Sequence, residues 1–234
     1  MNIIKKNLQI AIDGPVAAGK SNVAQRLAKR LGILYIYTGA MYRAVGYLGT
    51  IYNLDLKKDE DKLVQLVKDN SIQLYPSQDD EYACIIKING KDITPKLFTH
   101  AASKASSDVA TLPKIRKLMV QAQQTIANNQ SVVMEGRDIT NVVLPNADLK
   151  IYMQADVEVR ANRRLKDLQK QGYSMTLEQV IKDTKERDFQ DLNRKADPLQ
   201  IVKDAWVLDT TDLTMDQVIQ EIVNKLEEKK LLTQ

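Results

Sequence analysis

At 234 residues, the chain is long enough to bury a sizeable hydrophobic core, as one large domain or as a core with small appendages. Its 34 basic and 30 acidic residues leave a formal net charge of +4, an excess too small to indicate nucleic acid or an anionic membrane as a partner. The single cysteine, Cys84, excludes an internal disulfide framework, and the single histidine, His100, argues against multi-histidine metal sites and histidine-centred triads.

The first predicted elements are a buried strand, a loop with two glycines and a helix. Residues 8–12 form a short apolar run that is typical of a buried strand. Val23, Leu27 and Leu31 recur at helical spacing and predict a helix that begins near residue 20. The loop between them fits the pattern G-x-x-x-x-G-K-[ST] and consists of Gly14, Pro15, Val16, Ala17, Ala18, Gly19, Lys20 and Ser21.

This order of strand, loop and helix aims backbone N–H groups and the positive end of a helix at one anion. Gly14 and Gly19 can take backbone angles closed to other residues, which allows the loop to approach a phosphate closely. Lys20 is expected to reach the β- and γ-phosphates of a nucleotide, and the Ser21 hydroxyl to bind Mg²⁺. The loop therefore predicts nucleotide binding, but it does not specify a reaction.

After the first helix, residues 34–37 predict a second strand, and we expect the two strands to form a parallel pair with a right-handed crossover. Residues 40–52 predict a helix, and the apolar positions between 63 and 67 predict another short one.

Residues 71–98 have a different character. Apolar and polar residues alternate over 72–75, as in a strand. Residues 76–80 predict a polar loop, and residues 82–88 predict another strand. Asn89 and Gly90 predict a hairpin turn from which residues 91–93 return. We expect a small antiparallel sheet inserted into a chain that otherwise alternates strands and helices.

The remaining chain returns to that alternation. Residues 101–128 predict helix, with Pro113 where a helix can begin, and three apolar runs predict strands at 131–134, 149–153 and 205–208. Capping signatures at Thr176 and Thr214 predict the starts of two late helices. The expected fold is α/β, a P-loop NTPase-type parallel sheet flanked by helices, with ligands beyond the carboxyl ends of the strands.

Several arginines are placed unlike ordinary surface arginines. They are Arg43 and Arg137 after predicted strands, Arg116 after Pro113, Arg187 and Arg194 with Asp191 on one helical face, and Arg160, Arg163 and Arg164 on another. Each helical set alone could be a solvated face with ion pairs. Together with a phosphate loop, they predict a second phosphorylated substrate, because guanidinium groups bind phosphate in a planar fork and stabilise phosphoryl transfer.

Five segments resemble the bacterial-type cytidylate kinase family. They are residues 10–15 leading into the loop, Thr38-Gly39-Ala40-Met41-Tyr42-Arg43, Glu135-Gly136-Arg137-Asp138-Ile139, Lys185-Glu186-Arg187-Asp188 with Asp191, Asn193 and Arg194, and residues 208–211. The resemblance covers nearly the whole chain in order. It implies transfer of the γ-phosphoryl group of ATP to CMP or dCMP, with Mg²⁺.

The resemblance also implies a single kinase unit with a core at about 1–39 and 101–234. Residues 40–100 would form a nucleoside-monophosphate-binding region that contains the antiparallel insert, at about 71–98. Residues 160–174 would form a helical lid whose closure brings arginines onto the ATP phosphates and excludes water.

Residue roles carry over from the family motif by motif. ATP would be bound by Gly14, Pro15, Val16, Ala17, Ala18, Gly19, Lys20, Ser21 and Asn22, and catalysis would use Lys20, Arg137, Arg187, Arg160 and Arg163. The CMP phosphate would be held by Arg43, Arg137 and Arg187, the cytosine by Ser107, Arg116, Asp138 and Arg194, and the sugar by Asp191, with Thr38 and Tyr42 also in the acceptor site.

Three positions depart from the family pattern. Tyr37 stands where the family most often has aspartate, Asn22 where it usually has threonine, and Thr140-Asn141 where it usually has Gly-Thr. Tyr37 supplies no charge, and Thr140 narrows the backbone angles that glycine allows. Because Lys20 and the phosphate-handling arginines are present, an active enzyme is expected.

Two other functions remain open from the residues. One is a P-loop kinase for UMP, AMP or another metabolite, and the other is a non-catalytic nucleotide sensor or scaffold, which the departures at Tyr37 and Thr140 would favour. The expected partners are ATP and CMP or dCMP, with no nucleic acid, no membrane and a monomeric chain. With no long apolar run and no signal peptide, the chain is expected to be cytoplasmic.

Overall fold

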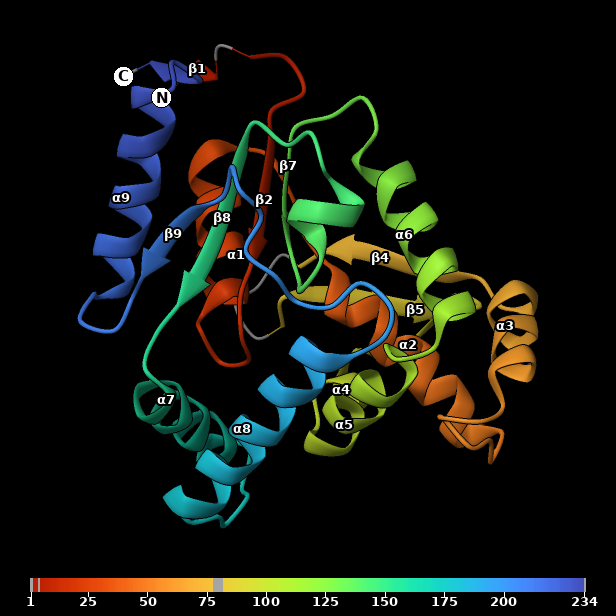
Figure 1. The fold of residues 1–234 in the computed structure, drawn as a ribbon. Coiled ribbons are helices and arrows are strands. Elements are labelled where there is room, and N and C mark those ends of the chain that lie inside the picture. Colours follow the sequence, from red (N-terminus) through yellow and green to blue (C-terminus); the bar gives the residue numbers. More distant parts are fainter. Residues whose placement is uncertain (1, 4, 78–81, 234) are drawn as a thin grey trace. The chain divides into compact units, whose positions relative to one another are not determined.

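The computed structural model describes residues 2–3, 5–77 and 82–233, so part of the polar loop expected at 76–80 lies outside the described residues. Figure 1 shows the fold. The chain divides into a core unit, residues 1–36 with 127–234, and an inserted unit, residues 37–126. Within the described residues, no helix has the length and apolarity needed to cross a membrane.

The core unit is built on a five-stranded sheet. Its strands, in spatial order, are β3 (Leu34–Tyr37), β7 (Val132–Glu135), β2 (Gln9–Asp13), β8 (Leu149–Gln154) and β9 (Trp206–Asp209). β2 pairs in parallel with both β7 and β8, and β8 pairs in parallel with β9. This sheet and its flanking helices confirm the predicted α/β class.

The expected pairing of the first two strands was wrong, because β7 lies between β2 and β3. All four residues of β7 are buried, and so are the last four residues of β2. In β3, only Ile36 is buried. Interior strands of a parallel sheet are covered on both faces, and the burial of the two strands agrees with β7 in the interior and β3 at the edge.

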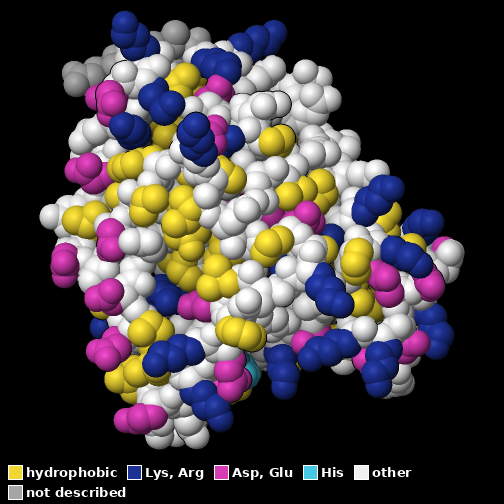
Figure 2. All heavy atoms as spheres, in the orientation of Figure 1, with side chains coloured by type: hydrophobic (Ala, Val, Ile, Leu, Met, Phe, Trp, Pro, Cys, Tyr) yellow, Lys and Arg dark blue, Asp and Glu magenta, His cyan; other side chains and the backbone are white. Residues whose placement is uncertain are grey.

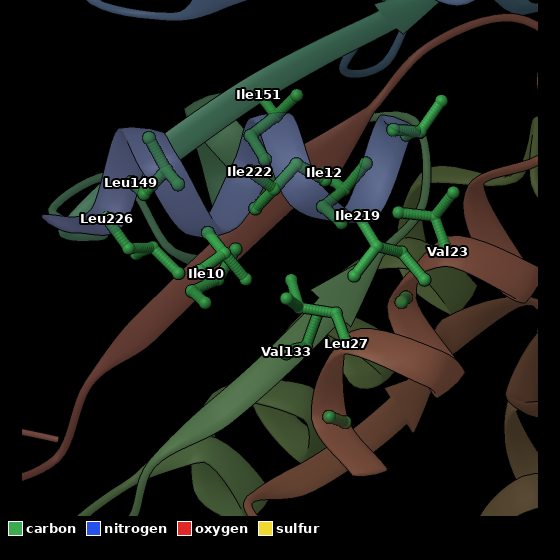
Figure 3. Close-up of a cluster of buried hydrophobic side chains, with 14 of the residues drawn as sticks. Ile10, Ile12, Val23, Leu27, Val133, Leu149, Ile151, Ile219, Ile222 and Leu226 are labelled. Carbon is green, nitrogen blue, oxygen red and sulfur yellow. The ribbon is translucent and has the colours of Figure 1, made fainter. Parts of the chain in front are cut away.

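One face of the sheet packs against two helices, α1 (Lys20–Leu31) and α9 (Met215–Glu228). Ile10 and Ile12 of β2 and Ile151 of β8 meet Leu27 of α1 and Ile222 of α9 in a cluster of fully or nearly fully buried side chains (Figure 3). α9 begins with the predicted capping box at Thr214. This packing fixes the strand that enters the phosphate loop and the helix that leaves it.

The core unit also contains a pair of helices, a π-helical turn and a pair of short strands. α7 (Val157–Lys170) and α8 (Leu177–Asn193) pack together around Ala161, Leu168 and Val180, and the capping box at Thr176 is present. A π-helical turn, η1 (Ile139–Val143), follows β7, and two short strands, β1 (Asn2–Ile3) and β10 (Leu232–Thr233), pair antiparallel. The sequence did not reveal the turn or the short pair.

The inserted unit contains the predicted antiparallel sheet, with β4 (Ile72–Pro76), β5 (Cys84–Ile88) and β6 (Lys91–Asp92) in that order. Its helices are α2 (Thr38–Ile51), α3 (Glu60–Asp69), α4 (Thr94–Leu97), α5 (His100–Val109) and α6 (Pro113–Ala127). Cys84 is buried in this unit, as expected for a small hydrophobe.

Residues 101–126 are largely helical, as expected, and α6 begins at Pro113, where a helix start was expected. The residue before a proline disfavours helical angles, which separates α5 from α6. The expected assignment of these residues to the core was wrong. α5 and nearly all of α6 belong to the inserted unit and not to the core, since Val109 and Ile115 pack with Met41, Val45 and Leu63.

In the core unit, the carboxyl end of central strand β2 leads into the phosphate loop, and the carboxyl end of β7 leads to Arg137 and Asp138. Because β2 and β7 are parallel neighbours, the two segments leave the same edge of the sheet, where α/β sheets bind ligands. Basic and acidic side chains intermingle over the molecular face in Figure 2, in keeping with the net charge of +4.

Candidate functional site

The phosphate loop is shaped by residues with left-handed backbone angles. Gly14 has a φ of +148°, and a Cβ there would overlap the Met153 carbonyl of β8. Gly19, with a φ of +90°, precedes α1, and no side chain caps the helix start. Ala17 also has a positive φ, 59°. The loop thus wraps tightly against β8 and leaves the start of α1 without a side-chain cap, as an anion-binding loop requires.

Lys20 is buried at the start of α1, and its Nζ donates to the Pro15 carbonyl at 2.7 Å. Burial, with the positive charge of Arg137, lowers the pKa of Lys20 to about 7, while the carboxylates of Glu135 and Asp191 act in the opposite direction. A phosphate would add negative charge beside this desolvated ammonium and so favour its charged form.

Ser21 and Glu135 bring oxygen atoms together beside this lysine. The Ser21 hydroxyl donates to Glu135 Oε1 at 3.0 Å, and Tyr35 Oη lies 3.5 Å from the same oxygen. Hydroxyl and carboxylate oxygens are ligands that suit Mg²⁺, which in nucleotide sites takes one or two protein ligands and completes its shell with phosphates and water. The pair fits the Mg²⁺ expected at Ser21. Within the described residues, no group of three or more His, Cys, Asp and Glu side chains forms a metal site.

The backbone of Val16, in the loop, is held at its N–H and at its carbonyl by the α7–α8 pair. Its N–H donates to Asp188 Oδ1 of α8 at 3.0 Å, and its carbonyl accepts from Arg160 Nη1 of α7 at 2.9 Å. Arg160 Nη1 also donates to Asp188 Oδ2 at 2.7 Å, and its Nε donates to the Ala155 carbonyl. We call this ring of contacts the Val16 bracket. It fixes the loop to two helices that do not adjoin it in sequence.

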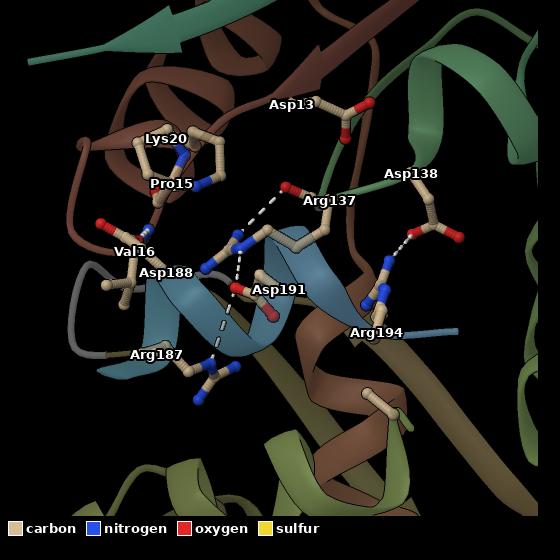
Figure 4. A network of polar contacts seen from close by, with 12 residues as sticks. Asp13, Pro15, Val16, Lys20, Arg137, Asp138, Arg187, Asp188, Asp191 and Arg194 are labelled. Carbon is tan, nitrogen blue, oxygen red and sulfur yellow. Dashed lines mark hydrogen bonds and ion pairs between the residues drawn. The ribbon is translucent and has the colours of Figure 1, made fainter. Parts of the chain in front are cut away.

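Arg137, Asp191 and Arg187 form a charged cluster after β7 (Figure 4). Arg137 Nε donates to Asp191 Oδ2 at 2.7 Å, and Arg187 Nε lies 3.7 Å from the same oxygen. Burial would raise the pKa of the Asp191 carboxyl, but the two guanidinium groups outweigh it and hold that pKa below its ordinary value. The cluster therefore presents two arginines around one ionised carboxylate.

Asp138 faces Arg194, which follows the last residue of α8. The side chains are 7% and 4% exposed, and Arg194 Nη2 lies 3.7 Å from Asp138 Oδ1. Arg194 Nε donates to the Asp197 carbonyl at 2.7 Å, which fixes the guanidinium on its other side. A carboxylate beside a guanidinium can match a base that carries both a donor and an acceptor.

Asp13, at the end of β2, holds the start of the π-turn. Its Oδ1 accepts from the Ile139 N–H at 3.0 Å, and its Oδ2 accepts from the Thr140 N–H at 2.7 Å and the Thr140 hydroxyl at 2.6 Å. Burial raises the pKa of Asp13, while these hydrogen bonds and the charge of Lys20 oppose that rise. The contact ties the segment of Arg137 and Asp138 to the strand that feeds the phosphate loop.

Two other predicted residues of the core unit lie apart from this network. Arg163 donates from Nη1 and Nη2 to the hydroxyl and carbonyl of Thr210, which follows β9. Asn22 is exposed on the first turn of α1.

The inserted unit holds the other predicted residues. Arg43 donates from Nη1 to the Leu97 carbonyl at 2.6 Å, and the buried Arg116 donates from Nη1 to the Ala110 carbonyl at 3.2 Å. The Cζ of Arg116 lies 5.9 Å from the centre of the Tyr42 ring. Thr38, Tyr42 and Ser107 are buried polar residues of α2 and α5.

The structure thus brings together Lys20, Ser21, Arg137, Arg187 and Asp191 in one electrostatic network, with Arg160 bound to the loop. Sequence reasoning assigned no role to Asp13, Glu135 or Asp188. Signals for them were present: Asp13 and Glu135 are carboxylates at the ends of apolar strands, and Asp188 lies one helical turn before Asp191.

Comparisons with known proteins show which family the chain resembles. A family model described as cytidylate kinase matches residues 10–228. A cytidylate kinase of Ligilactobacillus salivarius is 44% identical over 96% of this chain and 98% of its own length. One from Lysinibacillus sphaericus is 43% identical over 97% and 100%. A crystal structure of an uncharacterized protein from Eubacterium ventriosum covers 94% of this chain and 98% of its own with a TM-score of 0.51, and at 12% identity it supports the fold alone.

Proposed function

The chain belongs to the cytidylate kinase family, and on that premise we propose that it transfers the γ-phosphoryl group of ATP to CMP or dCMP, giving ADP and CDP or dCDP. The observation that carries the proposal is the desolvated Lys20 of the phosphate loop beside Arg137 and Asp191. Phosphoryl transfer needs positioned positive charge around the moving group more than it needs covalent chemistry from the protein.

On the donor side, the loop residues 14–22 bind the ATP phosphates, and Lys20 contacts the β- and γ-phosphates. Ser21 and Glu135 supply oxygen atoms for Mg²⁺, which neutralises phosphate charge when it is bound. Arg160 and Arg163 of α7 are proposed to act on the ATP phosphates when the lid, residues 160–174, closes.

On the acceptor side, the phosphate of CMP is bound by Arg137 and Arg187 in the core unit and by Arg43 in the inserted unit. Asp191 binds the sugar hydroxyls. Thr38 and Tyr42 complete the acceptor contacts.

The acceptor phosphate oxygen is already ionised near neutral pH, so the reaction requires no general base. The protein's work is to orient the two phosphorylated groups and to offset the charge that concentrates between them. A reaction that requires no general base does not depend on the single histidine, which lies on α5 in the inserted unit.

Cytosine is read by Asp138 with Arg194, and by Ser107 with Arg116. The exocyclic amine of cytosine donates to a carboxylate such as Asp138, and its ring acceptor takes a hydrogen bond from a guanidinium. Uracil presents an acceptor in place of the amine, which would leave Asp138 facing another acceptor. A buried polar mismatch of this kind costs about 1–3 kcal/mol.

Initial rates of ADP release with CMP, dCMP, UMP and AMP under saturating MgATP test the proposal. We expect CMP and dCMP to be the preferred acceptors. Comparable turnover of CMP and AMP would contradict the reading of cytosine by Asp138 and Arg194, and no nucleotide-dependent ADP release would contradict the kinase assignment. An Asp138→Asn variant should lose the preference for CMP over UMP. It should still release ADP from ATP, by hydrolysis or by transfer of the phosphoryl group.

A further inference from the structure

Tyr37 is the last residue of the edge strand β3 and directly precedes α2, and its ring folds back over the first turn of that helix. It occupies the position that caps the helix, with φ −86° and ψ 92°, but its side chain makes no capping hydrogen bond. A Cβ built on Gly39 would lie 2.8 Å from Cε2 of the Tyr37 ring, so the ring occupies the space that the missing side chain leaves. The ring therefore has a role other than capping.

The guanidinium of Arg43, one and a half turns further along α2, lies beside this ring. Its Cζ is 5.9 Å from the centre of the Tyr37 ring and 5.4 Å from the centre of the Phe98 ring. The two rings contact each other, with centroids 6.0 Å apart and planes 39° apart. Tyr82 supports Phe98 from 5.2 Å, so the rings form a continuous aromatic group.

One further contact fixes the orientation of Arg43. Its Nη1 donates to the Leu97 carbonyl at 2.6 Å, in the residue directly before Phe98. The guanidinium has five N–H donors in a rigid fork, so this bond leaves others to serve an anion. Rings and a carbonyl together restrict the side chain from more than one direction.

The aromatic contact has a different electrostatic result from an ion pair. A ring face attracts a guanidinium through its quadrupole but carries no net charge, so the cation is positioned and keeps its full positive charge. A carboxylate in the same position would neutralise it. For a residue that must bind a doubly ionised phosphate, positioning without neutralisation preserves the attraction.

We propose that Tyr37, with Phe98, is a positioning residue that orients the Arg43 guanidinium toward the phosphate of the acceptor nucleotide. The proposal rests on the proposed function, in which Arg43 binds that phosphate. Tyr37 acts through Arg43 and takes no part in reading the base.

The test compares Tyr37→Leu and Tyr37→Phe with a matched control, Tyr47→Leu. Tyr47 packs against the same apolar cluster and also lies beside a cation, with Lys96 Nζ 5.7 Å from its ring centre, but Lys96 is assigned no substrate. We expect Tyr37→Leu to raise the KM for CMP about five-fold, with the KM for ATP unchanged. Tyr37→Phe keeps the ring face and should behave as wild type, as should Tyr47→Leu.

Competitive inhibition by cytidine, which has no phosphate, separates an effect on Arg43 from an effect on the base. The inhibition constant of cytidine should be the same in Tyr37→Leu and in wild type. Equal weakening of CMP and cytidine, an unchanged KM for CMP, or equal effects of Tyr37→Leu and Tyr47→Leu would each overturn the proposal.

Phe98→Leu removes the second ring and should also raise the KM for CMP selectively, which keeps the proposal testable if Tyr37→Leu folds poorly. Thermal unfolding of each variant reports that outcome. Wild-type protein that turns over no CMP would contradict the proposed function, and with it this inference. Wild-type turnover with an unaltered KM in both leucine variants would overturn the inference alone.

Discussion

Arg43 of the inserted unit and three arginines of the core unit are held in different ways. In the core unit, carboxylates hold Arg137, Arg160 and Arg194, through Asp191, Asp188 and Asp138 respectively. In the inserted unit, the described contacts of Arg43 are two aromatic rings and a backbone carbonyl.

The two kinds of partner suit two different roles of arginine, one in a buried ionic network and one in binding an anion. A buried guanidinium paired with a carboxylate is part of a network in which losing one member leaves an uncompensated buried charge. A guanidinium held by rings and carbonyls keeps its charge available and leaves no ion behind when it is removed. We therefore expect substitutions in the core unit to affect stability and binding together, and the substitution of Arg43 to affect mainly binding.

Lys20 shows whether the comparison extends to a buried cation that donates a hydrogen bond to a backbone carbonyl. Lys20→Ala should lower kcat about 10²–10³-fold, the effect of removing one preorganised donor from a transition state. Thermal stability should not fall, because the substitution removes a buried ammonium whose pKa burial already lowers to about 7. Coupled ADP release and thermal unfolding check the two parts, and retained turnover would contradict the assignment of Lys20 to the phosphates.

Arg137→Ala against Arg43→Ala is the most direct test of the difference. Arg137→Ala should reduce the free energy of unfolding by about 3 kcal/mol, because Asp191 stays buried without its nearest cation. Arg43→Ala should reduce it by about 1 kcal/mol or less. Urea unfolding of both variants measures this, and equal losses of stability would break the comparison.

The contribution of the Asp191 carboxylate to stability should depend on pH. Its pKa in the folded protein lies below the ordinary 3.8, so its ionised form stabilises the fold fully above pH 4, and the contribution is lost as pH falls through the lower, folded pKa. Asp191→Asn should destabilise the protein by about 2 kcal/mol at pH 7.

The deficit of Asp191→Asn relative to wild type should shrink as the pH falls below about 4, because wild type then protonates as well. Urea unfolding at pH 7 and at a series of values below pH 4 provides the comparison. A deficit that is constant over this range would show that the charge of Asp191 is not what stabilises the cluster.

Substitution of Thr140 has the smallest expected effect. It tests Asp13, a carboxylate that accepts hydrogen bonds from backbone N–H groups. Thr140→Val removes the hydroxyl that donates to Asp13 but keeps the side-chain shape, and it should cost about 1 kcal/mol of stability. Thr140→Ser keeps the hydroxyl and serves as the control. If both variants unfold at the same urea concentration, the hydroxyl contributes nothing and the two backbone donors alone hold Asp13.

Local signals in the sequence predicted the elements well. The strand, loop and helix around Gly14 to Ser21, the capping boxes at Thr176 and Thr214, and the hairpin turn at Asn89 each depend on residues close together in the chain. The order of the strands was not predictable in the same way. The position of β7 beside β2 depends on which strand is covered on both faces, and the pairing of β1 with β10 joins two-residue segments from opposite ends of the chain.

The candidate site likewise combines residues that local motifs predict with contacts between residues far apart in the chain. Lys20 belongs to a loop motif whose spacing alone indicates phosphate chemistry, and the resemblance to a known family implied the roles of Arg137 and Arg187. The contacts of Asp13 with Thr140 and of Asp188 with Val16 join residues more than 120 positions apart. No local pattern encodes such contacts, because they exist only after the sheet has formed and α8 has packed against the loop.

The Val16 bracket has a mechanical consequence. Since α8 holds the N–H of Val16 and α7 holds its carbonyl, a shift of one helix against the other must stretch the contacts of the loop. Hydrogen exchange at the single amide of Val16 would therefore report the separation of two helices that begin more than 140 residues further along the chain.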